Sequence, residues 1–133
     1  MYKRQGEPLI ADGSIDVVLS NCVLNLVNPS ARDRLLANIR RVLAPGGLVA
    51  ISDIVCDQVV PLRLQQDPDL WSGCISGAWQ EQAFLEAFEA LGFEQVRYAD
   101  RSEQPWRVVE GIEFRALTLV GVLPAEGQCS SCC

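Results

Sequence analysis

The chain has 133 residues, and its 17 acidic against 11 basic side chains give a formal net charge of −6. This length allows one domain at most, and a hydrophobic fraction of 49% is enough for a globular core. The acidic balance without a basic patch argues against nucleic-acid and membrane partners. Because the sequence has no membrane-spanning apolar run and no recognisable signal peptide, we expect a cytoplasmic protein.

The two ends of the chain differ from its middle. Residues 1–5 (Met-Tyr-Lys-Arg-Gln) resemble the translation of a transposon adapter used in preparing sequencing libraries. We therefore expect residues 1–5 to be foreign to the domain, with an ordinary polar N-terminus as the alternative. We place the domain at residues 6–123 and a flexible, cysteine-rich tail at residues 124–133.

The first half of the domain predicts a strand, a helix and a second strand. Residues 15–20 are a nearly continuous apolar run, typical of a strand buried on both faces. Apolar residues at helical spacing follow Ser30, a candidate N-cap, with Arg32 and Arg34 on the polar side. The turn Pro-Gly-Gly at 45–47 ends this helix, and residues 48–55 form the next buried strand.

The second half opens with a long irregular segment, residues 56–77, which contains prolines, glycines and short helical pieces. Long loops in compact domains are usually functional. Residues 80–91 predict a helix, and 93–98 and 111–122 predict two further strands. The complete order predicts an α/β fold.

The six cysteines fall into two groups. Three lie within or beside the expected elements and three lie in the tail: Cys22, Cys56, Cys74, Cys129, Cys132 and Cys133. A disulfide-stapled domain would spread its cysteines through loops, so we interpret all six as reduced thiols. Histidine is absent, which excludes an imidazole base in this chain.

Cys22 directly follows the first predicted strand, in Ser-Asn-Cys-Val-Leu-Asn-Leu at 20–26. Ligands bind at the carboxyl ends of strands in open α/β sheets, so a soft nucleophilic sulfur is well placed there. The alternative is a small buried apolar residue. Cys74 lies in the Gly/Ser-rich segment Trp-Ser-Gly-Cys-Ile-Ser-Gly-Ala at 71–78, where a lone cysteine could be incidental.

These two segments together resemble the S-adenosylmethionine-dependent arsenite methyltransferases. The turn Arg-Val-Leu-Ala-Pro-Gly-Gly-Leu at 41–48 is similar to one found widely in class I methyltransferases. The resemblance extends over residues 6–121. It implies the C-terminal half of a Rossmann-like class I methyltransferase sheet that ends in an antiparallel strand pair.

The resemblance implies that Cys22 and Cys74 are the catalytic cysteines that bind arsenic(III), while a third family cysteine has no counterpart here. Trivalent arsenic prefers thiolates, and its lone pair can attack the methyl group of S-adenosylmethionine, the implied cofactor. Asn21 lies where class I methyltransferases place residues near that cofactor. The implied partners are arsenite or its thiol conjugates and a thiol reductant such as thioredoxin or glutathione, in a detoxifying reaction.

One expected cofactor-binding element is missing, because no acidic-Gly-x-Gly-x-Gly loop occurs in the chain. In the family that loop and an acidic residue after a second strand hold the cofactor. We therefore expect a fragment that neither binds the cofactor normally nor methylates arsenic. We also expect the sheet edge at residues 15–20 to be exposed and prone to association.

Cys129, Cys132 and Cys133 in the tail could deliver a soft ion to Cys22 and Cys74, or could have no function. Two other functions remain open for the whole protein. One is a methyltransferase for another small acceptor, such as a quinone precursor or an organic thiol. The other is a non-catalytic thiol module that sequesters arsenite or another soft metal.

Overall fold

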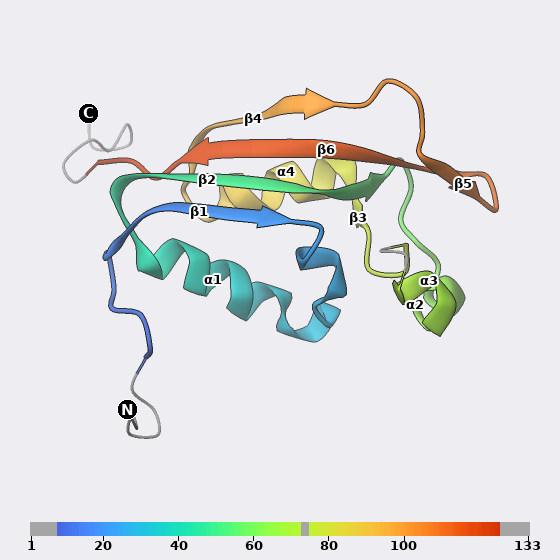
Figure 1. Ribbon diagram of the computed structural model, residues 1–133, viewed down its shortest axis with the longest axis horizontal. Helices are drawn as coiled ribbons and strands as arrows, with labels where there is room; N and C mark the ends of the chain where they lie inside the picture. The colour runs from blue at the N-terminus through green and yellow to red at the C-terminus, as the bar shows by residue number, and fades with distance from the viewer. Residues whose placement is uncertain (1–7, 73–74, 126–133) are drawn as a thin grey trace.

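The computed structural model describes residues 8–72 and 75–125 as a mixed β-sheet with helices (Figure 1). In chain order the elements are β1 (Ile15–Asn21), the 3-10 turns η1 (Leu24–Leu26) and η2 (Pro29–Ala31), α1 (Arg32–Val42), β2 (Leu43–Cys56), α2 (Leu62–Gln65), α3 (Pro68–Ser72), β3 (Trp79–Gln80), α4 (Glu81–Ala90), β4 (Glu94–Arg101), β5 (Arg107–Val109) and β6 (Ile112–Val122). Each predicted helix and strand is present, and β3 and β5 are additional. Within the described ranges no helix has the length and apolar character needed to cross a membrane.

The sheet has the strand order β1-β2-β6-β4, with β3 paired to the end of β2 and β5 to β6. β1 and β2 are parallel, and Val18 lies opposite Val49. β6 runs antiparallel to both β2 and β4. The predicted α/β fold with a final antiparallel pair is therefore confirmed, and the carboxyl ends of β1 and β2 lie at the same edge.

The main core lies between one face of this sheet and the helices α1 and α4. Alternate residues of β2 and β6 point into it, as their period-two spacing requires. The cluster contains Leu36, Ile39, Val49, Ile51, Val55, Phe84, Phe88, Phe93, Leu117 and Leu119. Phe84, Phe88 and Phe93 stack edge to face with centroids 5.6 and 5.8 Å apart, which fixes α4 on the sheet.

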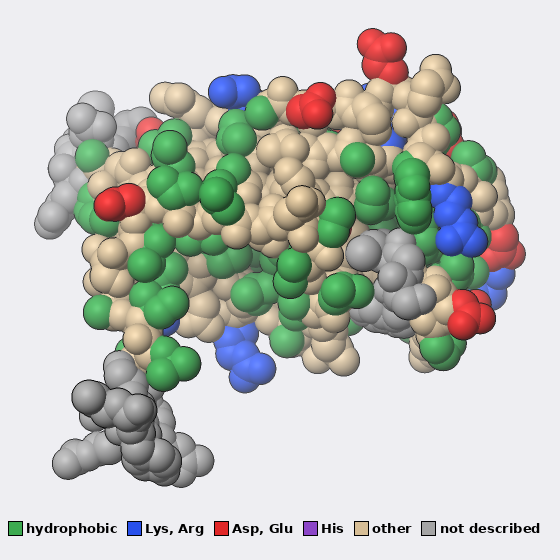
Figure 2. Space-filling view, in the orientation of Figure 1, with side chains coloured by type: hydrophobic (Ala, Val, Ile, Leu, Met, Phe, Trp, Pro, Cys, Tyr) green, Lys and Arg blue, Asp and Glu red, His purple; other side chains and the backbone are tan. Residues whose placement is uncertain are grey.

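The opposite face is covered only at one end. Ile54, Cys56 and Phe114 pack there against the segment that contains α2, in a second buried cluster. Farther along the face, Val17 is 46% exposed and Leu19 is 74% exposed. Figure 2 views the molecule from the side opposite α4 and shows hydrophobic side chains open to solvent on this face.

The prediction that residues 15–20 are buried on both faces is therefore wrong for the described chain. β1 alternates between half-buried and exposed residues because helices cover only one side of it. β1 is also the last strand in the order, so the prediction of an exposed edge at residues 15–20 is confirmed. Its tendency to associate stays a prediction.

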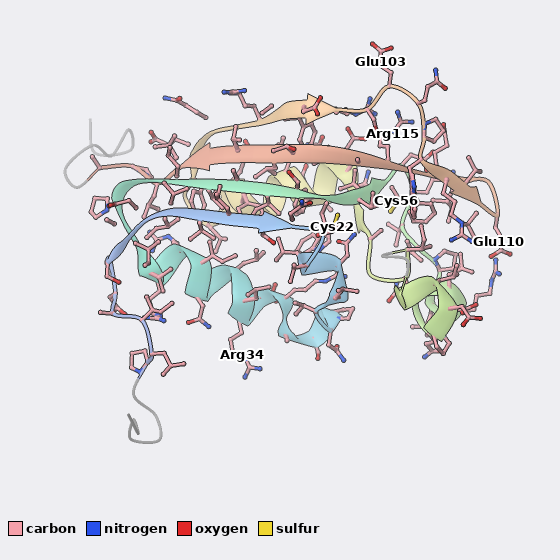
Figure 3. The ribbon with its side chains drawn as sticks, in the orientation of Figure 1. Cys22, Arg34, Cys56, Glu103, Glu110 and Arg115 are labelled. Atoms are coloured by element: carbon pink, nitrogen blue, oxygen red, sulfur yellow. The ribbon has the colours of Figure 1, made fainter. Side chains whose placement is uncertain are left out.

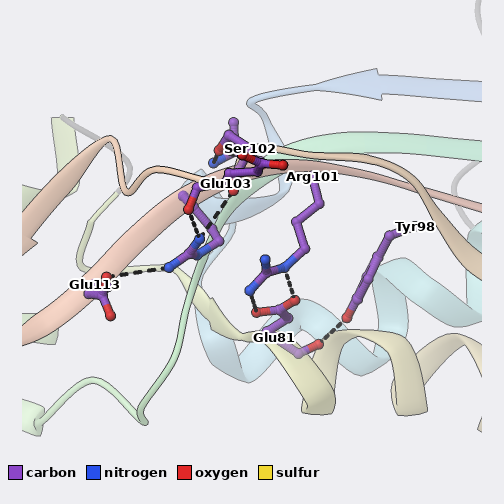
Figure 4. Close-up of polar contacts among 8 residues, drawn as sticks. Glu81, Tyr98, Arg101, Ser102, Glu103 and Glu113 are labelled. Carbon is purple, nitrogen blue, oxygen red and sulfur yellow. Dashed lines mark hydrogen bonds and ion pairs between the residues drawn. The ribbon is translucent and has the colours of Figure 1, made fainter.

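α4 is fastened to the antiparallel part of the sheet by polar contacts as well as by its aromatic face (Figure 4). The Tyr98 hydroxyl donates to the Glu81 carbonyl, and the Arg101 guanidinium pairs with the Glu81 carboxylate. Burial and the nearby Glu81 carboxylate raise the pKa of Tyr98 to about 12. These contacts bind the first turn of α4 to β4.

The start of α1 differs from the prediction that Ser30 is its N-cap. The Asn28 side chain accepts the backbone N–H of Ser30 at 3.0 Å and begins η2 instead. α1 then starts at Arg32 with no side-chain cap. Asparagine readily closes such local turns, and the N-cap position moves from the predicted Ser30 to Ala31, a shift of one residue.

Candidate functional site

The carboxyl ends of β1 and β2 bring Asn21 opposite Ser52, and Cys22 follows immediately. The Cys22 backbone N–H donates to the Ser52 carbonyl at 2.8 Å, and its φ is 56°. A positive φ is uncommon for a residue with a Cβ, and it turns the chain sharply out of the strand. The turn leaves the thiol exposed at the edge of the sheet (Figure 3).

Two buried polar side chains fasten the loop after Cys22 to β2. The Asp53 carboxylate, 2% exposed, accepts the N–H of Asn25 at 3.2 Å and that of Ile54 at 2.9 Å. The fully buried Asn25 donates its Nδ2–H to the Ile54 carbonyl at 2.6 Å. Any slip of the loop would leave buried polar groups unpaired, so these bonds hold it in one position.

Burial also sets the electrostatics of the loop. Desolvation raises the pKa of Asp53, and its backbone N–H donors and Arg32 oppose that rise. Desolvation and then the nearby Asp53 carboxylate raise the pKa of Cys22 above its ordinary value. Cys22 is therefore mostly a neutral thiol at neutral pH rather than an activated thiolate.

A small cavity of about 120 Å³ opens beside Cys22. Its polar lining comes from the ends of β1 and β2 and from the β4 side of the sheet: Asn21, Ser52, Asp53, Asp100, Ser102 and Thr118. Ser52 Oγ and Thr118 Oγ1, on the paired strands β2 and β6, lie 2.7 Å apart and share a hydrogen bond in the cavity lining. Hydroxyl and carboxylate groups thus line the cavity beside the Cys22 sulfur. Asn21, the predicted cofactor contact, is an exposed residue of the same lining.

Cys56, at the end of β2, has a different environment from Cys22 although both lie at the same end of the sheet (Figure 3). It is buried, and its Sγ lies 3.2 Å from the Trp79 carbonyl, to which the thiol donates. Burial raises its pKa to about 12. Cys56 is therefore a packing residue, and it lies within β2 rather than in the irregular segment in which the sequence placed it.

The other predicted cysteines, Cys74 in the 56–77 segment and Cys129, Cys132 and Cys133 in the tail, lie outside the described residues. In residues 8–72 and 75–125, no three His, Cys, Asp or Glu side chains gather closely enough to hold a metal ion. The pairing of Cys22 with Cys74 thus stays a prediction.

Arg32 is a residue that the sequence analysis placed wrongly. The helical pattern predicted it on the polar side of α1, but its guanidinium lies 4.7 Å from the ring centroid of Trp79 and donates to the Gly77 carbonyl. The first turn of α1 faces the long segment that precedes β3, which helical periodicity alone does not reveal. Arg34, two residues later, projects into solvent (Figure 3).

Residues 5–92 match the family of the methyltransferase domain. The chain therefore belongs to the methyltransferase domain family. Solved structures of low identity show the same fold, among them a Haemonchus contortus phosphoethanolamine N-methyltransferase with 14% identity and a TM-score of 0.63 over 86% of this chain and 34% of that chain.

Two curated relatives of higher identity are named arsenite methyltransferase. The arsenite methyltransferase of Halobacterium salinarum is 42% identical over 94 residues, and that of Aquipseudomonas alcaligenes is 36% identical over 101 residues. These matches cover 71% and 76% of this chain but only 24% and 28% of the relatives. The crystal structure of an arsenic(III) S-adenosylmethionine methyltransferase from Chlamydomonas reinhardtii has 30% identity and a TM-score of 0.75, over 91% of this chain and 41% of that chain.

The chain thus spans about a quarter of the length of the curated relatives it matches.

Proposed function

We propose that the chain is part of an arsenite methyltransferase, in which Cys22 and Cys74 bind trivalent arsenic as the substrate. The observation that supports this most directly is the exposed Cys22 thiol, held by a buried hydrogen-bonded loop at the carboxyl edge of a methyltransferase sheet. The relatives named arsenite methyltransferase support the choice of substrate.

The neutral state of Cys22 suits this substrate. Arsenite is present as As(OH)₃ at neutral pH, so each thiol proton can leave with one arsenic hydroxide as water while an As–S bond forms. No general base is needed, and the chain contains no histidine to provide one. Two sulfur ligands leave the arsenic lone pair available as the nucleophile.

The described residues provide little of a cofactor site. S-adenosylmethionine, when bound, supplies an electrophilic sulfonium methyl group. Its usual cradle is a glycine-rich turn before a helix, whereas Asn28, Pro29 and Ser30 precede α1 here and Asn21 is the one predicted contact. We therefore assign substrate binding to this chain and derive no cofactor-dependent step from its residues.

Further parts of the proposal concern the tail and the partners. Cys129, Cys132 and Cys133 would capture arsenite and transfer it to Cys22 and Cys74 by thiol exchange. Methylation of arsenic(III) removes two electrons from it, so a thiol reductant such as thioredoxin or glutathione would return it to the trivalent state. The reduced thiols fit a reducing compartment such as the cytoplasm.

Arsenite binding by the full chain tests the proposal. The parent for this experiment carries serine at 129, 132 and 133, so that the tail does not contribute. Tryptophan fluorescence during an arsenite titration, with a non-thiol reductant present, gives the affinity. We expect Cys22→Ser and Cys74→Ser each to weaken binding by about 100-fold, because a two-site ligand becomes a one-site ligand.

A matched control is Cys56→Ala, which removes a buried thiol outside the proposed pair. This control should bind arsenite like the parent once its folding has been verified by circular dichroism. Equal affinity of Cys22→Ser and the parent would refute the proposal.

A further inference from the structure

A row of polar residues crosses the face of the sheet that is opposite to the main core. Ile51 of β2 points into that core, so the next residue, Ser52, points to the opposite face. The same alternation places Thr118 on this face, because Leu119 beside it on β6 lies in the core. The members of the row lie directly opposite one another on β1, β2, β6 and β4: Asn21, Ser52, Thr118 and Asp100.

The polar character of β2 and β6 on this face is confined to that row. Ala50 lies opposite Val120 on one side of it, and Ile54 lies opposite Ala116 on the other. Over residues 48–56 and 112–122, every other side chain that these two strands place on the face is aliphatic, aromatic or a cysteine. The two hydroxyls therefore stand alone in an apolar surface, where a polar group is costly unless it forms hydrogen bonds.

The row coincides with the cavity beside Cys22. All of its members line this cavity, which has a volume of about 120 Å³. The Cys22 backbone N–H donates to the Ser52 carbonyl at 2.8 Å, so the thiol-bearing residue is joined directly to the row. The cavity has room for several groups of the size of a water molecule.

The hydrogen-bonding groups of the lining suit a neutral ligand with hydroxyl groups. Ser52 Oγ and Thr118 Oγ1 lie 2.7 Å apart, and their shared bond uses one of their two O–H donors. One donor and several lone pairs remain for a ligand, and the exposed Asp100 carboxylate adds acceptors. No lysine or arginine is among the described residues that line the cavity, so the same lining repels an anion.

We infer that this polar row is the subsite for the hydroxyl groups of arsenic, and that it receives As(OH)₃ as Cys22 forms the first As–S bond. The inference rests on the proposed function and adds to it the neutral, hydroxylated form of the substrate. In this step the S–H bond and one As–O bond break, an As–S bond forms and water leaves, with no change in oxidation state. Two hydroxyl groups stay on arsenic, where Ser52, Thr118 and Asp100 hydrogen-bond them.

The test uses the full chain with serine at 74, 129, 132 and 133, which leaves Cys22 and the buried Cys56 as the cysteines. The concentration of an arsenical that protects Cys22 from alkylation by iodoacetamide measures binding to this single thiol. Arsenite is compared with dimethylarsinous acid, (CH₃)₂AsOH, which has no hydroxyl group left once it is bonded to one sulfur.

We expect Thr118→Val to weaken protection by arsenite about fivefold and Asp100→Asn about tenfold, because each removes a hydrogen bond to arsenic hydroxyl and the second bond is charge-assisted. Protection by dimethylarsinous acid should stay within about twofold of the parent in both variants. Glu94→Gln is the matched control, since it neutralises an exposed carboxylate of β4 outside the cavity lining. It should match the parent with both arsenicals.

Two results would overturn the inference. One is protection by arsenite in Asp100→Asn and in folded Thr118→Val equal to that in Glu94→Gln. The other is equal weakening for arsenite and dimethylarsinous acid, which would indicate a general disturbance of the Cys22 loop. Asp100→Asn carries the test if Thr118→Val does not fold, because Asp100 is exposed. Failure of the proposed function gives a different result, in which neither arsenical protects Cys22 even with Cys74 intact.

Discussion

Replacing Asn25 with alanine tests whether the Cys22 loop is held by buried hydrogen bonds. The substitution removes the bond from Asn25 Nδ2 to the Ile54 carbonyl, which is 2.6 Å long and fully buried. An unpaired buried carbonyl costs about 1–3 kcal/mol, and the cavity left by the side chain adds to this. We expect the free energy of unfolding to fall by about 2–3 kcal/mol, which corresponds to a decrease in Tm of about 6–12 °C for a domain of this size.

Asn38→Ala is the matched control. Asn38 also donates its Nδ2–H to a backbone carbonyl, that of Arg34, at 3.0 Å, but this bond is exposed on α1. Water replaces an exposed hydrogen bond, and alanine favours the helix, so this change should lie within about 0.5 kcal/mol of the parent. Urea denaturation followed by far-UV circular dichroism measures both variants. A loss for Asn25→Ala no larger than that for Asn38→Ala would refute the argument from burial.

Three further predictions concern the thiols and the open face. At pH 8 iodoacetamide should label Cys22 but not Cys56 in the native protein, because Cys56 is buried with a pKa of about 12. Peptide mass spectrometry shows which site reacts. Fast labelling of Cys56 would contradict its assignment as a packing residue. Asp53→Asn removes a negative charge that raises the pKa of Cys22, so the pH at which Cys22 alkylation reaches half its maximal rate should decrease; an unchanged pH profile would contradict this. Leu19→Lys should reduce self-association in light scattering, since Leu19 is 74% exposed on the edge strand, and unchanged association would show that this face is not responsible.

The order of helices and strands could be predicted because each has a strong local signal. β2 and β6 are long apolar runs, and α4 has an apolar stripe with Gly92 at its end, where φ is 94°. β3 and β5 could not be predicted, since each is two or three residues long and exists through pairing with a neighbouring strand. The exposure of β1 also depends on which layers surround it, which a single apolar run does not reveal.

The candidate site likewise combines residues whose position could be predicted from the sequence with contacts that could not. Cys22 could be placed at the strand end because the strand before it has a clear pattern, and Asp53 could be placed at the end of the next strand for the same reason. The contact between Arg32 and Trp79 joins positions 47 residues apart, and the helical period favours a solvent-facing Arg32. Such contacts depend on how the long segment before β3 folds back, and no local signal in the sequence specifies that path.

The most direct test of the central proposal is X-ray absorption at the arsenic K-edge on the full chain loaded with arsenite. The chain again carries serine at 129, 132 and 133, with a non-thiol reductant. The account predicts two sulfur ligands per arsenic in this parent and fewer than two in both Cys22→Ser and Cys74→Ser. The same sulfur coordination in Cys22→Ser as in the parent would contradict the assignment of Cys22 as an arsenic ligand.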